Sequence, residues 1–550
     1  MYCFDQLREM KLFAIITILL ASTAYSQTAD HSAEVDKIFA WTKANEPGCA
    51  VAASQDGKIV INKAYGLADL ERETPITANT VFDAGSVRKQ FVAASILLLA
   101  GDGKLALTDD IRKYIPELPD YDSKITIDHL LTHTSGIRDW QPLLNLAGGD
   151  PTAMTMILRQ RGLNFKPGDE WSYSNSGYVL LPEIVTRVSG VPFAEFVQKR
   201  VFEPAGMKST TYVEDPLFLI KNRALAYKKD KDRWKMDMYL GNERGGAGAL
   251  FTTAVDLVAW NDALNANKLG AALTQKLQEP ATLNNGRKLT YAHGVQVEPF
   301  RKGGQLVWHS GGAAGYSTIE GRLPQQGISV AITCNADGSA RSAYAGKIFD
   351  LFVPGAVNET PPPSNPNSVA VGDLSTRAGL FFDEKTGQPL RIASNNNGLV
   401  IPGSGPLTVL AADRFKNQRA TPFFMSEAEF ELQFLSADRI ELKTKEGQVS
   451  NYRRAQAWRP TVDDLKAFAG RYQSDELLAT FDATPTKDGL NVRANEANTI
   501  EFKPAEKDTF QIGQMLLRFR RDAAGSVVGL EYSNPLLRDI KFTRVSVVRT

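Results

Sequence analysis

The sequence predicts an α+β unit followed by two small all-β modules. Helix-like and strand-like runs are mixed from about residue 30 to residue 353, a polar stretch rich in Pro follows over 354–368, and strand-like runs dominate after it. Helices lying between an early hairpin and a late antiparallel meander are typical of an α+β unit. The domain boundaries expected from these shifts are 27–353, a linker over 354–368, and β modules over 369–457 and 458–550.

The elements of the α+β unit are assigned in chain order. A helix over 31–45 precedes strands over 49–55 and 58–66, which the Asp56-Gly57 turn joins as a hairpin. Amphipathic periodicity then predicts helices over 87–100, 126–133, 151–160, 177–189, 193–202 and 254–265. Strand-like runs predict a meander over 290–299, 305–309, 316–322 and 328–334.

The two β modules are assigned from an internal repeat. Asp373-Leu374 with Ala378-Gly379 recurs as Asp464-Leu465 with Ala469-Gly470. A repeated pattern of short strands predicts two copies of one all-β module, each of which is expected to close as a small antiparallel barrel.

Charge and composition exclude several functions. The 63 Lys+Arg nearly balance the 62 Asp+Glu, so the net charge is +1 and no basic patch for nucleic acid or anionic membrane is expected. The five His are scattered without metal-ligand spacing, so we expect no metal and no cofactor.

The amino-terminal segment resembles an export signal. Lys11, an apolar run over 12–21 and Ala24-Tyr25-Ser26 predict a signal peptide over 1–26. A membrane anchor is the alternative, but a span needs about 20 apolar residues and this run has about half of them. A periplasmic or extracellular protein without a membrane span after cleavage is expected.

Cleavage would leave Cys49 and Cys334, each in a strand-like run. Two buried thiols that act as small hydrophobes are favoured over a disulfide.

The strongest chemical motif is Ser86-x-x-Lys89 at the start of a predicted helix. A spacing of three places both side chains on one face of the first turn, where a neutral amine can activate the hydroxyl. Burial and the helix N-terminus both disfavour a charged Lys89, and the same helix end directs backbone N–H groups at an oxyanion. An N-cap serine beside a surface lysine is the alternative.

Two further motifs carry chemical groups. Tyr173-Ser174-Asn175 precedes a predicted helix, and a phenol can relay protons if a nearby cation lowers its pKa. His309-Ser310-Gly311-Gly312 ends a predicted strand, where glycines let a substrate use backbone N–H groups. The alternatives are a polar loop and a structural histidine. Similar tripeptides in the β modules, Tyr532-Ser533-Asn534 and Lys385-Thr386-Gly387, are interpreted as structural.

Together these motifs resemble the serine β-lactamase and penicillin-binding-protein superfamily, in its class C β-lactamase-like branch of secreted serine hydrolases. The resemblance covers about residues 33–352 and implies an antiparallel sheet flanked by helices, with a helical subdomain. It implies that Ser86 is acylated with Lys89 as base, and that Tyr173 shares proton transfer to the leaving group and activates the deacylating water. It also implies that Asn175, Ser310 and Gly311 position substrate.

The resemblance further implies an oxyanion hole made by the backbone N–H groups of Ser86 and Gly312. His309 stands where β-lactamases of this family carry a lysine, which argues against efficient β-lactam hydrolysis. His-x-Gly is similar to D-aminopeptidases and related esterases, and the former also carry two C-terminal β-barrels. The predicted substrate is therefore a small D-amino-acid or cell-wall-derived peptide. A carboxylesterase or weak β-lactamase, and a peptidoglycan-binding module with a vestigial site, are the alternatives; the oligomeric state is left open.

Overall fold

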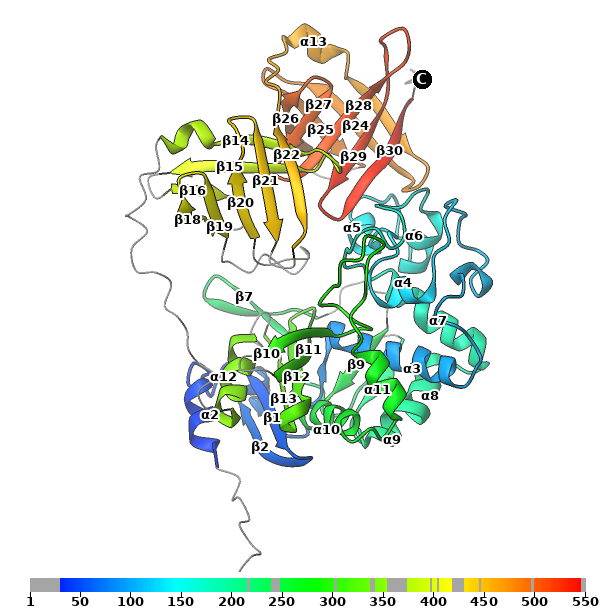
Figure 1. Ribbon diagram of the computed structural model, residues 1–550, viewed down its shortest axis with the longest axis vertical. Helices are drawn as coiled ribbons and strands as arrows, with labels where there is room; N and C mark the ends of the chain where they lie inside the picture. Colours follow the sequence, from blue (N-terminus) through cyan, green and yellow to red (C-terminus); the bar gives the residue numbers. More distant parts are fainter. Residues whose placement is uncertain are drawn as a thin grey trace, which may run out of the picture.

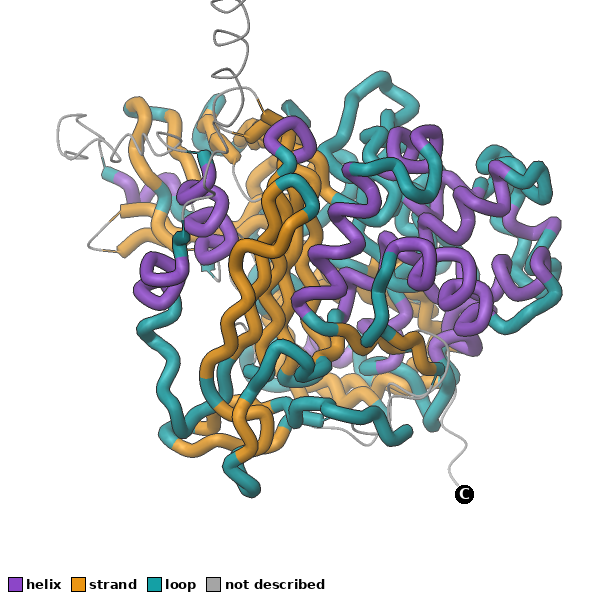
Figure 2. The backbone as a smooth tube through the Cα atoms, turned by 90° about the horizontal axis from the view of Figure 1, so that it is seen from below, coloured by secondary structure: helices purple, strands orange, loops and turns teal. Residues whose placement is uncertain are grey.

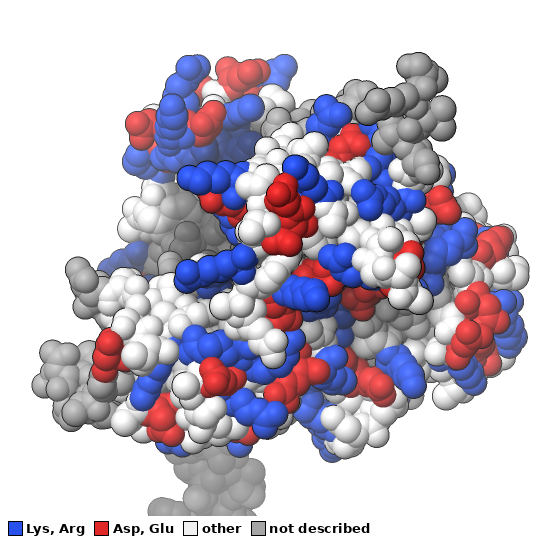
Figure 3. Space-filling model, turned by 90° about the horizontal axis from the view of Figure 1, so that it is seen from above, with Lys and Arg blue, Asp and Glu red and all other residues white. Residues whose placement is uncertain are grey.

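The computed structural model describes residues 30–214, 218–238, 248–300, 304–336, 342–353, 373–395, 398–402, 405–417, 430–444, 447–495 and 499–545. The predicted signal peptide over 1–26 and the predicted linker over 354–368 lie outside these ranges. Within them, no helix is long and apolar enough to cross a membrane. The face seen in Figure 3 intersperses positive and negative side chains, in keeping with the net charge of +1.

A six-stranded antiparallel sheet forms the centre of the α+β unit, in the order β10-β11-β12-β13-β1-β2. Its strands are β1 (Cys49–Gln55), β2 (Lys58–Tyr65), β10 (Gln296–Phe300), β11 (Gly304–Ala313), β12 (Tyr316–Leu323) and β13 (Ile328–Cys334). The first and last segments of the unit are neighbours, because β1 pairs with β13. The predicted hairpin and meander thus belong to one sheet (Figures 1 and 2).

Helices cover both faces of the sheet. Strand β1 alternates between the two cores: Val51 and Ala53 pack with α2 (Ser32–Ile38) and α12 (Ser342–Phe352), whereas Ala50 and Ala52 face the larger core. That core also holds α10 (Ala254–Asn265) and α3 (Lys89–Gly101). Successive side chains of a strand point to opposite faces of the sheet, so β1 contributes to the hydrophobic cores on both sides.

The remaining helices form a helical part beside the sheet (Figure 1). They are α4 (Ile127–Leu131), α5 (Trp140–Leu144), α6 (Ala153–Arg159), α7 (Gly177–Ser189), α8 (Phe193–Val197), α9 (Glu203–Ala205) and α11 (Ala271–Leu277). A π-helical turn over Gln198–Phe202 follows α8. Short strands complete the unit: β3 (Leu67–Asp69), β4 (Thr74–Pro75), β5 (Phe82–Asp83), β6 (Thr211–Val213), β7 (Tyr227–Asp230), β8 (Arg233–Met236) and β9 (Ala249–Thr252).

Several predicted elements are longer than the observed ones, and two of them have a clear local cause. The helix expected over 31–45 ends at Ile38, and Phe39 instead stacks on Tyr65 with 5.1 Å between ring centroids. The strand expected from residue 290 begins at Gln296, because Ala292 N–H donates to Val295 O and closes a turn before it.

The two β modules differ from each other. The second closes as a barrel of eight strands, as predicted: β23 (Gly470–Ser474), β24 (Ala479–Pro485), β25 (Leu490–Ala494), β26 (Thr499–Glu506), β27 (Thr509–Ile512), β28 (Met515–Arg521), β29 (Val527–Asn534) and β30 (Leu537–Val545). Helix α13 (Val462–Lys466) precedes it.

The first module is a nine-stranded sheet whose end strands, β17 and β18, do not pair with each other within the described residues. Its strands are β14 (Gly379–Asp383), β15 (Pro389–Asn395), β16 (Gly398–Ile401), β17 (Gly405–Pro406), β18 (Thr408–Ala411), β19 (Arg414–Asn417), β20 (Phe430–Phe434), β21 (Arg439–Thr444) and β22 (Val449–Arg454). The expectation of closure is therefore not met there, although inward side chains from β14 to β21 share one apolar core.

The barrel is attached to the helical part by buried and partly buried polar contacts. Arg138 Nη1 forms a 2.8 Å ion pair with Glu476, and the two side chains are 4% and 6% exposed. Asn164 Nδ2 donates to Leu536 O, while Arg538 Nη2 donates to Glu170. Removing one partner of a pair that is buried this completely would leave an uncompensated buried charge and destabilise the contact between the barrel and the helices.

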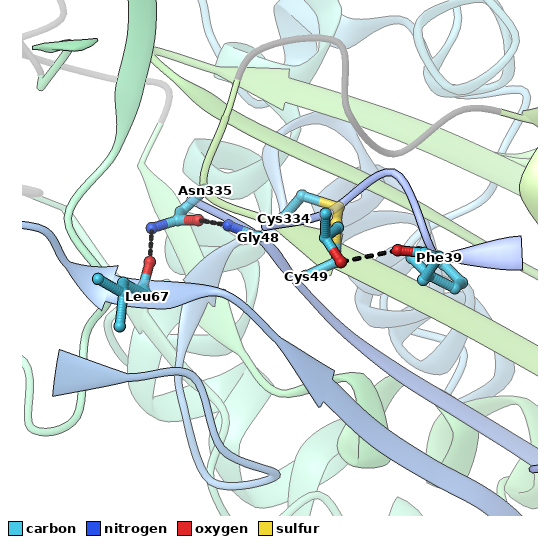
Figure 4. The surroundings of a disulfide bond; sticks show 7 residues. Phe39, Gly48, Cys49, Leu67, Cys334 and Asn335 are labelled. Atoms are coloured by element: carbon cyan, nitrogen blue, oxygen red, sulfur yellow. Dashed lines mark hydrogen bonds between the residues drawn. A yellow bond between two sulfur atoms is a disulfide. The ribbon is translucent and has the colours of Figure 1, made fainter. Parts of the chain in front are cut away.

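The preference for unpaired thiols is wrong. Cys49 and Cys334 form a disulfide between β1 and β13, where they are directly opposed in the strand register. Beside it, Asn335 accepts a hydrogen bond from Gly48 N–H and donates to Leu67 O (Figure 4). The first strand begins and the last strand ends at a cysteine, and antiparallel pairing brings these two ends together.

Candidate active site

Ser86 lies in a 3₁₀ turn, Gly85–Arg88, that leads directly into α3. Gly85 has a φ of +53°, and a Cβ at this position would lie 2.7 Å from the backbone nitrogen of Gly312. A Cβ on Gly311 would likewise lie 2.0 Å from Ala84 O. Only glycine allows this approach, so the Gly-Ser sequence and the glycines of β11 hold the turn against the strand.

Two side chains donate hydrogen bonds to the Ser86 hydroxyl. Lys89 Nζ donates to Ser86 Oγ at 3.0 Å, and the Tyr173 hydroxyl donates to the same oxygen at 2.7 Å. Lys89 is fully buried, whereas Ser86 retains 7% exposure. The structure therefore brings together the serine, lysine and tyrosine that the sequence placed on two distant motifs.

Burial shapes the charge state of Lys89. Desolvation, and then the nearby positive charge of Arg88, hold the pKa of Lys89 well below its usual value. Asn175 Oδ1 accepts a 2.9 Å hydrogen bond from Lys89 Nζ, and a carbonyl oxygen brings no negative charge that would restore the ammonium. A neutral amine with a free lone pair is the form that can accept the serine proton.

Asp139 holds Asn175 in place, and the sequence motifs gave no sign of it. Its Oδ2 accepts hydrogen bonds from the backbone N–H and the Nδ2 of Asn175, at 3.0 and 2.9 Å. These bonds fix the amide so that its oxygen faces Lys89. Asp139 is the N-cap of α5, and this cap position is the one sequence feature that could have drawn attention to it.

Tyr173 remains a phenol. Burial raises its pKa, and this effect exceeds the opposing effects of the hydrogen bond to Ser86 and the charge of Arg88. Arg88 is thus a cation of the kind that the sequence prediction required, but burial outweighs its effect and the pKa of Tyr173 is raised. Tyr173 is suited to donating a proton rather than to removing one.

Strand β11 carries the remaining predicted residues along one side of Ser86. Ser310, Gly311 and Gly312 pair in register with Ile319, Thr318 and Ser317 of β12. Gly311 is buried against the Ser86 turn and Gly312 is exposed. The backbone of Gly312 thus lies beside the turn that carries Ser86.

His309 is buried within a chain of aromatic and imidazole groups. Tyr291 lies between two histidines, with its hydroxyl 3.1 Å from both His133 Nε2 and His309 Nε2. Ser174 N–H donates to His133 Nδ1, and His309 Nδ1 bonds to Ser310 O. This pattern fixes one direction: His133 Nε2–H donates to Tyr291, whose hydroxyl donates to His309 Nε2.

The imidazole rings of His133 and His309 are both neutral. Desolvation lowers the pKa of His309 to about 3, and desolvation also holds the pKa of His133 well below its usual value. His309 therefore offers no cation to a substrate carboxylate. Neither His133, at the end of the helix predicted over 126–133, nor Tyr291 was predicted as a site residue.

A second buried network lies behind the catalytic turn. Glu320, opposite His309 in the sheet, accepts 2.7 Å hydrogen bonds from Gln90 Nε2 and Asn261 Nδ2. Burial raises the pKa of Glu320 to about 7, against the lowering effect of these bonds. Its only signal in the sequence is an acidic residue within an apolar strand.

Replacing Glu320 by glutamine is expected to change how stability depends on pH. The folded-state pKa near 7 lies above the ordinary value of 4.5, so the stability that protonated Glu320 provides is complete below pH 4.5 and is lost as the pH rises to 7. Across this window the wild type should lose about 3 kcal/mol more than Glu320→Gln. Urea unfolding of both proteins at several pH values measures this, and parallel curves would contradict it.

The two tripeptides interpreted as structural lie away from Ser86. Tyr532-Ser533-Asn534 is part of β29 in the barrel, and Lys385-Thr386-Gly387 forms the turn between β14 and β15. Within the described residues, no cluster of three or more His, Cys, Asp or Glu side chains is arranged to hold a metal ion.

An antiparallel sheet flanked by helices, with a serine, a low-pKa lysine and a tyrosine hydrogen-bonded at its edge, defines a serine hydrolase. The family model described as Beta-lactamase matches residues 33–353, more than half of the chain. The chain belongs to the beta-lactamase family.

Comparison with individual proteins extends the similarity beyond this region. A D-aminopeptidase of Brucella anthropi is 25% identical over 527 residues, covering 91% of this chain and 95% of the relative. Penicillin-binding protein 4* of Bacillus subtilis (strain 168) is 30% identical over 291 residues, covering 49% of this chain and 64% of that protein. An octameric penicillin-binding protein homologue from Pyrococcus abyssi shares the fold, with a TM-score of 0.53 and 22% identity over 76% of this chain and 98% of its own.

Proposed function

We propose that this chain is a secreted amidase or peptidase that cleaves D-amino-acid peptides through an acyl-enzyme on Ser86. The observation that carries the proposal is the low-pKa Lys89 amine 3.0 Å from the Ser86 hydroxyl. Similarity to a D-aminopeptidase over 91% of the chain, both β modules included, supports the substrate class.

In the first step, the neutral Lys89 amine accepts the Ser86 proton while Oγ attacks the substrate carbonyl carbon. The negative charge on the carbonyl oxygen is stabilised by the N–H groups of Ser86 and Gly312. The carbon–nitrogen bond then breaks, and the leaving amine takes a proton from the Tyr173 phenol, which recovers one from Lys89. Water then attacks the ester carbon and loses a proton to Lys89, and Lys89 gives this proton to Ser86 Oγ as the carbon–Oγ bond breaks and the carboxylic acid leaves.

The neutral charge state of His309 affects which substrates the site can bind. A substrate carboxylate beside this residue would find no fixed positive charge, because the imidazole is unprotonated and its Nε2 accepts from Tyr291. Ser310, Gly311 and Asn175 would position the substrate by backbone and amide hydrogen bonds instead. Uncharged amide or ester ends are therefore better substrates than the carboxylate of a β-lactam.

Export to the periplasm or the extracellular space is part of the proposal. The Cys49–Cys334 disulfide supports it, because such bonds persist in oxidising compartments and are rare in a reducing cytosol.

A substrate panel tests the proposed reaction. D-alanine nitroanilide, L-alanine nitroanilide, a nitrophenyl ester and a chromogenic cephalosporin are compared by kcat/KM, with Ser86→Ala as the blank. We expect turnover of the D-anilide at least tenfold above its L-isomer, and little cephalosporin hydrolysis. Ester hydrolysis without any anilide turnover would favour a carboxylesterase, and no turnover together with no acyl adduct would favour a binding protein; either result would overturn the proposal.

A further inference from the structure

The β-barrel contacts the chain on both sides of helix α5, which lies beside it in Figure 1. Arg138, two residues before the helix, reaches the barrel with its guanidinium group. Its Nη1 pairs with Glu476 at 2.8 Å, and its Nη2 donates to Arg538 O at 2.9 Å. The amino-terminal end of α5 therefore follows directly from a residue that barrel groups hold.

The loop after α5 also fits closely against the barrel. Gly148 N–H donates to Leu477 O at 3.0 Å. Asn495 Nδ2 donates to Ala147 O at 3.2 Å. A Cβ on Gly148 would lie 2.0 Å from Leu478 O, so a larger residue there would push the two parts away from each other. Barrel groups thus hold the chain before and after this helix of five residues.

The backbone around Arg138 is joined to the segment that carries Asn175. Ser176 Oγ donates to Arg138 O at 2.7 Å and accepts from Trp140 N–H at 3.0 Å. Gln160 makes two further bonds to the backbone of Arg138, since its Oε1 accepts from the N–H and its Nε2 donates to the carbonyl oxygen. These side chains are all buried. A shift of Arg138 would therefore be passed on to Ser176 and to its neighbour Asn175.

Asp139 completes the connection to the catalytic lysine. Its Oδ2 accepts from both N–H groups of Asn175, and Asn175 Oδ1 accepts from Lys89 Nζ at 2.9 Å. Burial and then Arg88 lower the pKa of Lys89, and the Asp139 carboxylate opposes them. Because Lys89 becomes an ammonium when it takes the serine proton, the position of Asp139 affects how well that charge is stabilised.

We propose that the β-barrel takes part in catalysis, with Glu476 as a positioning residue for Lys89. The connection runs along the hydrogen bonds just described, from the buried ion pair to the N-cap of α5, and from there to the amide of Asn175. The catalytic part of this proposal rests on the proposed function. The physical connection between the barrel and the site does not, so the two can be tested separately.

The test compares Glu476→Gln with Glu506→Gln, both in the full chain. The first removes the charge that pairs with Arg138, and the second removes a charge that pairs with Arg453 at 2.9 Å between the two β modules. Labelling of Ser86 by a serine-directed phosphonate is followed at several concentrations, at a temperature where all variants are folded. Glu476→Gln should lower the rate constant of the bound reagent about tenfold and leave its affinity unchanged, because the reacting groups are misaligned. Glu506→Gln should match the wild type.

A double-mutant cycle tests whether Glu476 acts through Asp139. Asp139→Asn keeps an acceptor for Asn175 but removes the charge, and it should lower the same rate constant about tenfold or more. If Glu476 acts through Asp139, the double variant should react no more slowly than the slower single variant. Reductions that multiply would show two independent effects and would overturn the proposed connection.

Gly148→Ala disturbs the same contact without leaving a buried charge unpaired, and it carries the test if Glu476→Gln does not fold. Its methyl group would press on Leu478 O, and the labelling rate constant should fall about threefold. Gly101→Ala, at the end of α3, is the matched control, because a Cβ there meets no atom within 4 Å.

Hydrogen exchange measures the connection without any reaction at Ser86. The N–H groups of Gln141 and Asn175 are both bonded to Asp139. Their exchange, followed in peptides from 137–145 and 172–178, should become several times faster in Glu476→Gln and in Gly148→Ala, and in neither control.

Unchanged exchange in both of these variants, or an unchanged labelling rate constant in both, would overturn the proposal. A wild type that the phosphonate does not label would count against the proposed function instead. The exchange rates would then still decide whether the barrel holds the site in place.

Discussion

Replacing Ser86 by alanine is expected to lower kcat/KM by roughly 10⁴-fold or more, because the attacking oxygen is removed while the fold is kept. The side-chain partners of Ser86 are Lys89 and Tyr173, and neither depends on it for burial. The variant should therefore unfold at nearly the same temperature as the wild type. Rates on the preferred anilide and a thermal melt of both proteins measure the two effects.

Covalent labelling adds an independent readout. A serine-directed phosphonate or a fluorescent penicillin should add its mass to the wild type at Ser86 and to no residue of Ser86→Ala. Ser174→Ala is the matched control: this neighbouring loop serine is 5% exposed, and its hydroxyl has no hydrogen-bond partner among the described residues. It should be labelled like the wild type. Labelling of Ser86→Ala, or loss of folding in it, would contradict the assignment.

The sequence predicted the reactive groups of this site because they lie in short motifs. Ser86 and Lys89 are one helical turn apart, so local geometry alone brings them together. Tyr173 and Asn175 required the family resemblance, since their loop reaches Ser86 only through the tertiary fold. The α+β order of elements and the closed second barrel also followed from local patterns and an internal repeat.

The supporting residues could not be predicted in the same way. Asp139, Tyr291 and Glu320 act through partners far along the chain, and no local pattern distinguishes them from ordinary polar residues. The roles of these residues depend on packing between segments far apart in the chain, which cannot be inferred from a single sequence.

The cysteines show where a usable signal was present. Cys49 opens the first long strand and Cys334 closes the last, and both positions were visible in the sequence. What was missing was the pairing of β1 with β13, which brings together residues 285 positions apart. Without that pairing, two buried thiols were the simpler interpretation.

Removing this disulfide is expected to destabilise the serine hydrolase unit by about 2–5 kcal/mol. The bond closes a loop with a sequence separation of 285, so it restricts the unfolded chain strongly and ties the first strand of the sheet to the last. The variant Cys49→Ala/Cys334→Ala leaves no free thiol at the site and removes little volume. Its free energy of unfolding in urea should therefore fall by this amount while the folded site remains intact.

Adding a reductant is the matched comparison, because it breaks the disulfide without replacing either cysteine by another residue. Unfolding of the wild type with reductant present should move to lower urea, towards that of the double variant, which reductant itself should leave unchanged. Activity at low temperature should persist in the double variant and in the reduced wild type. The hydrogen bonds of Lys89 go to Ser86 and Asn175, and neither cysteine takes part in them. If the double variant and the oxidised wild type unfold at the same urea concentration, the bond does not stabilise the sheet.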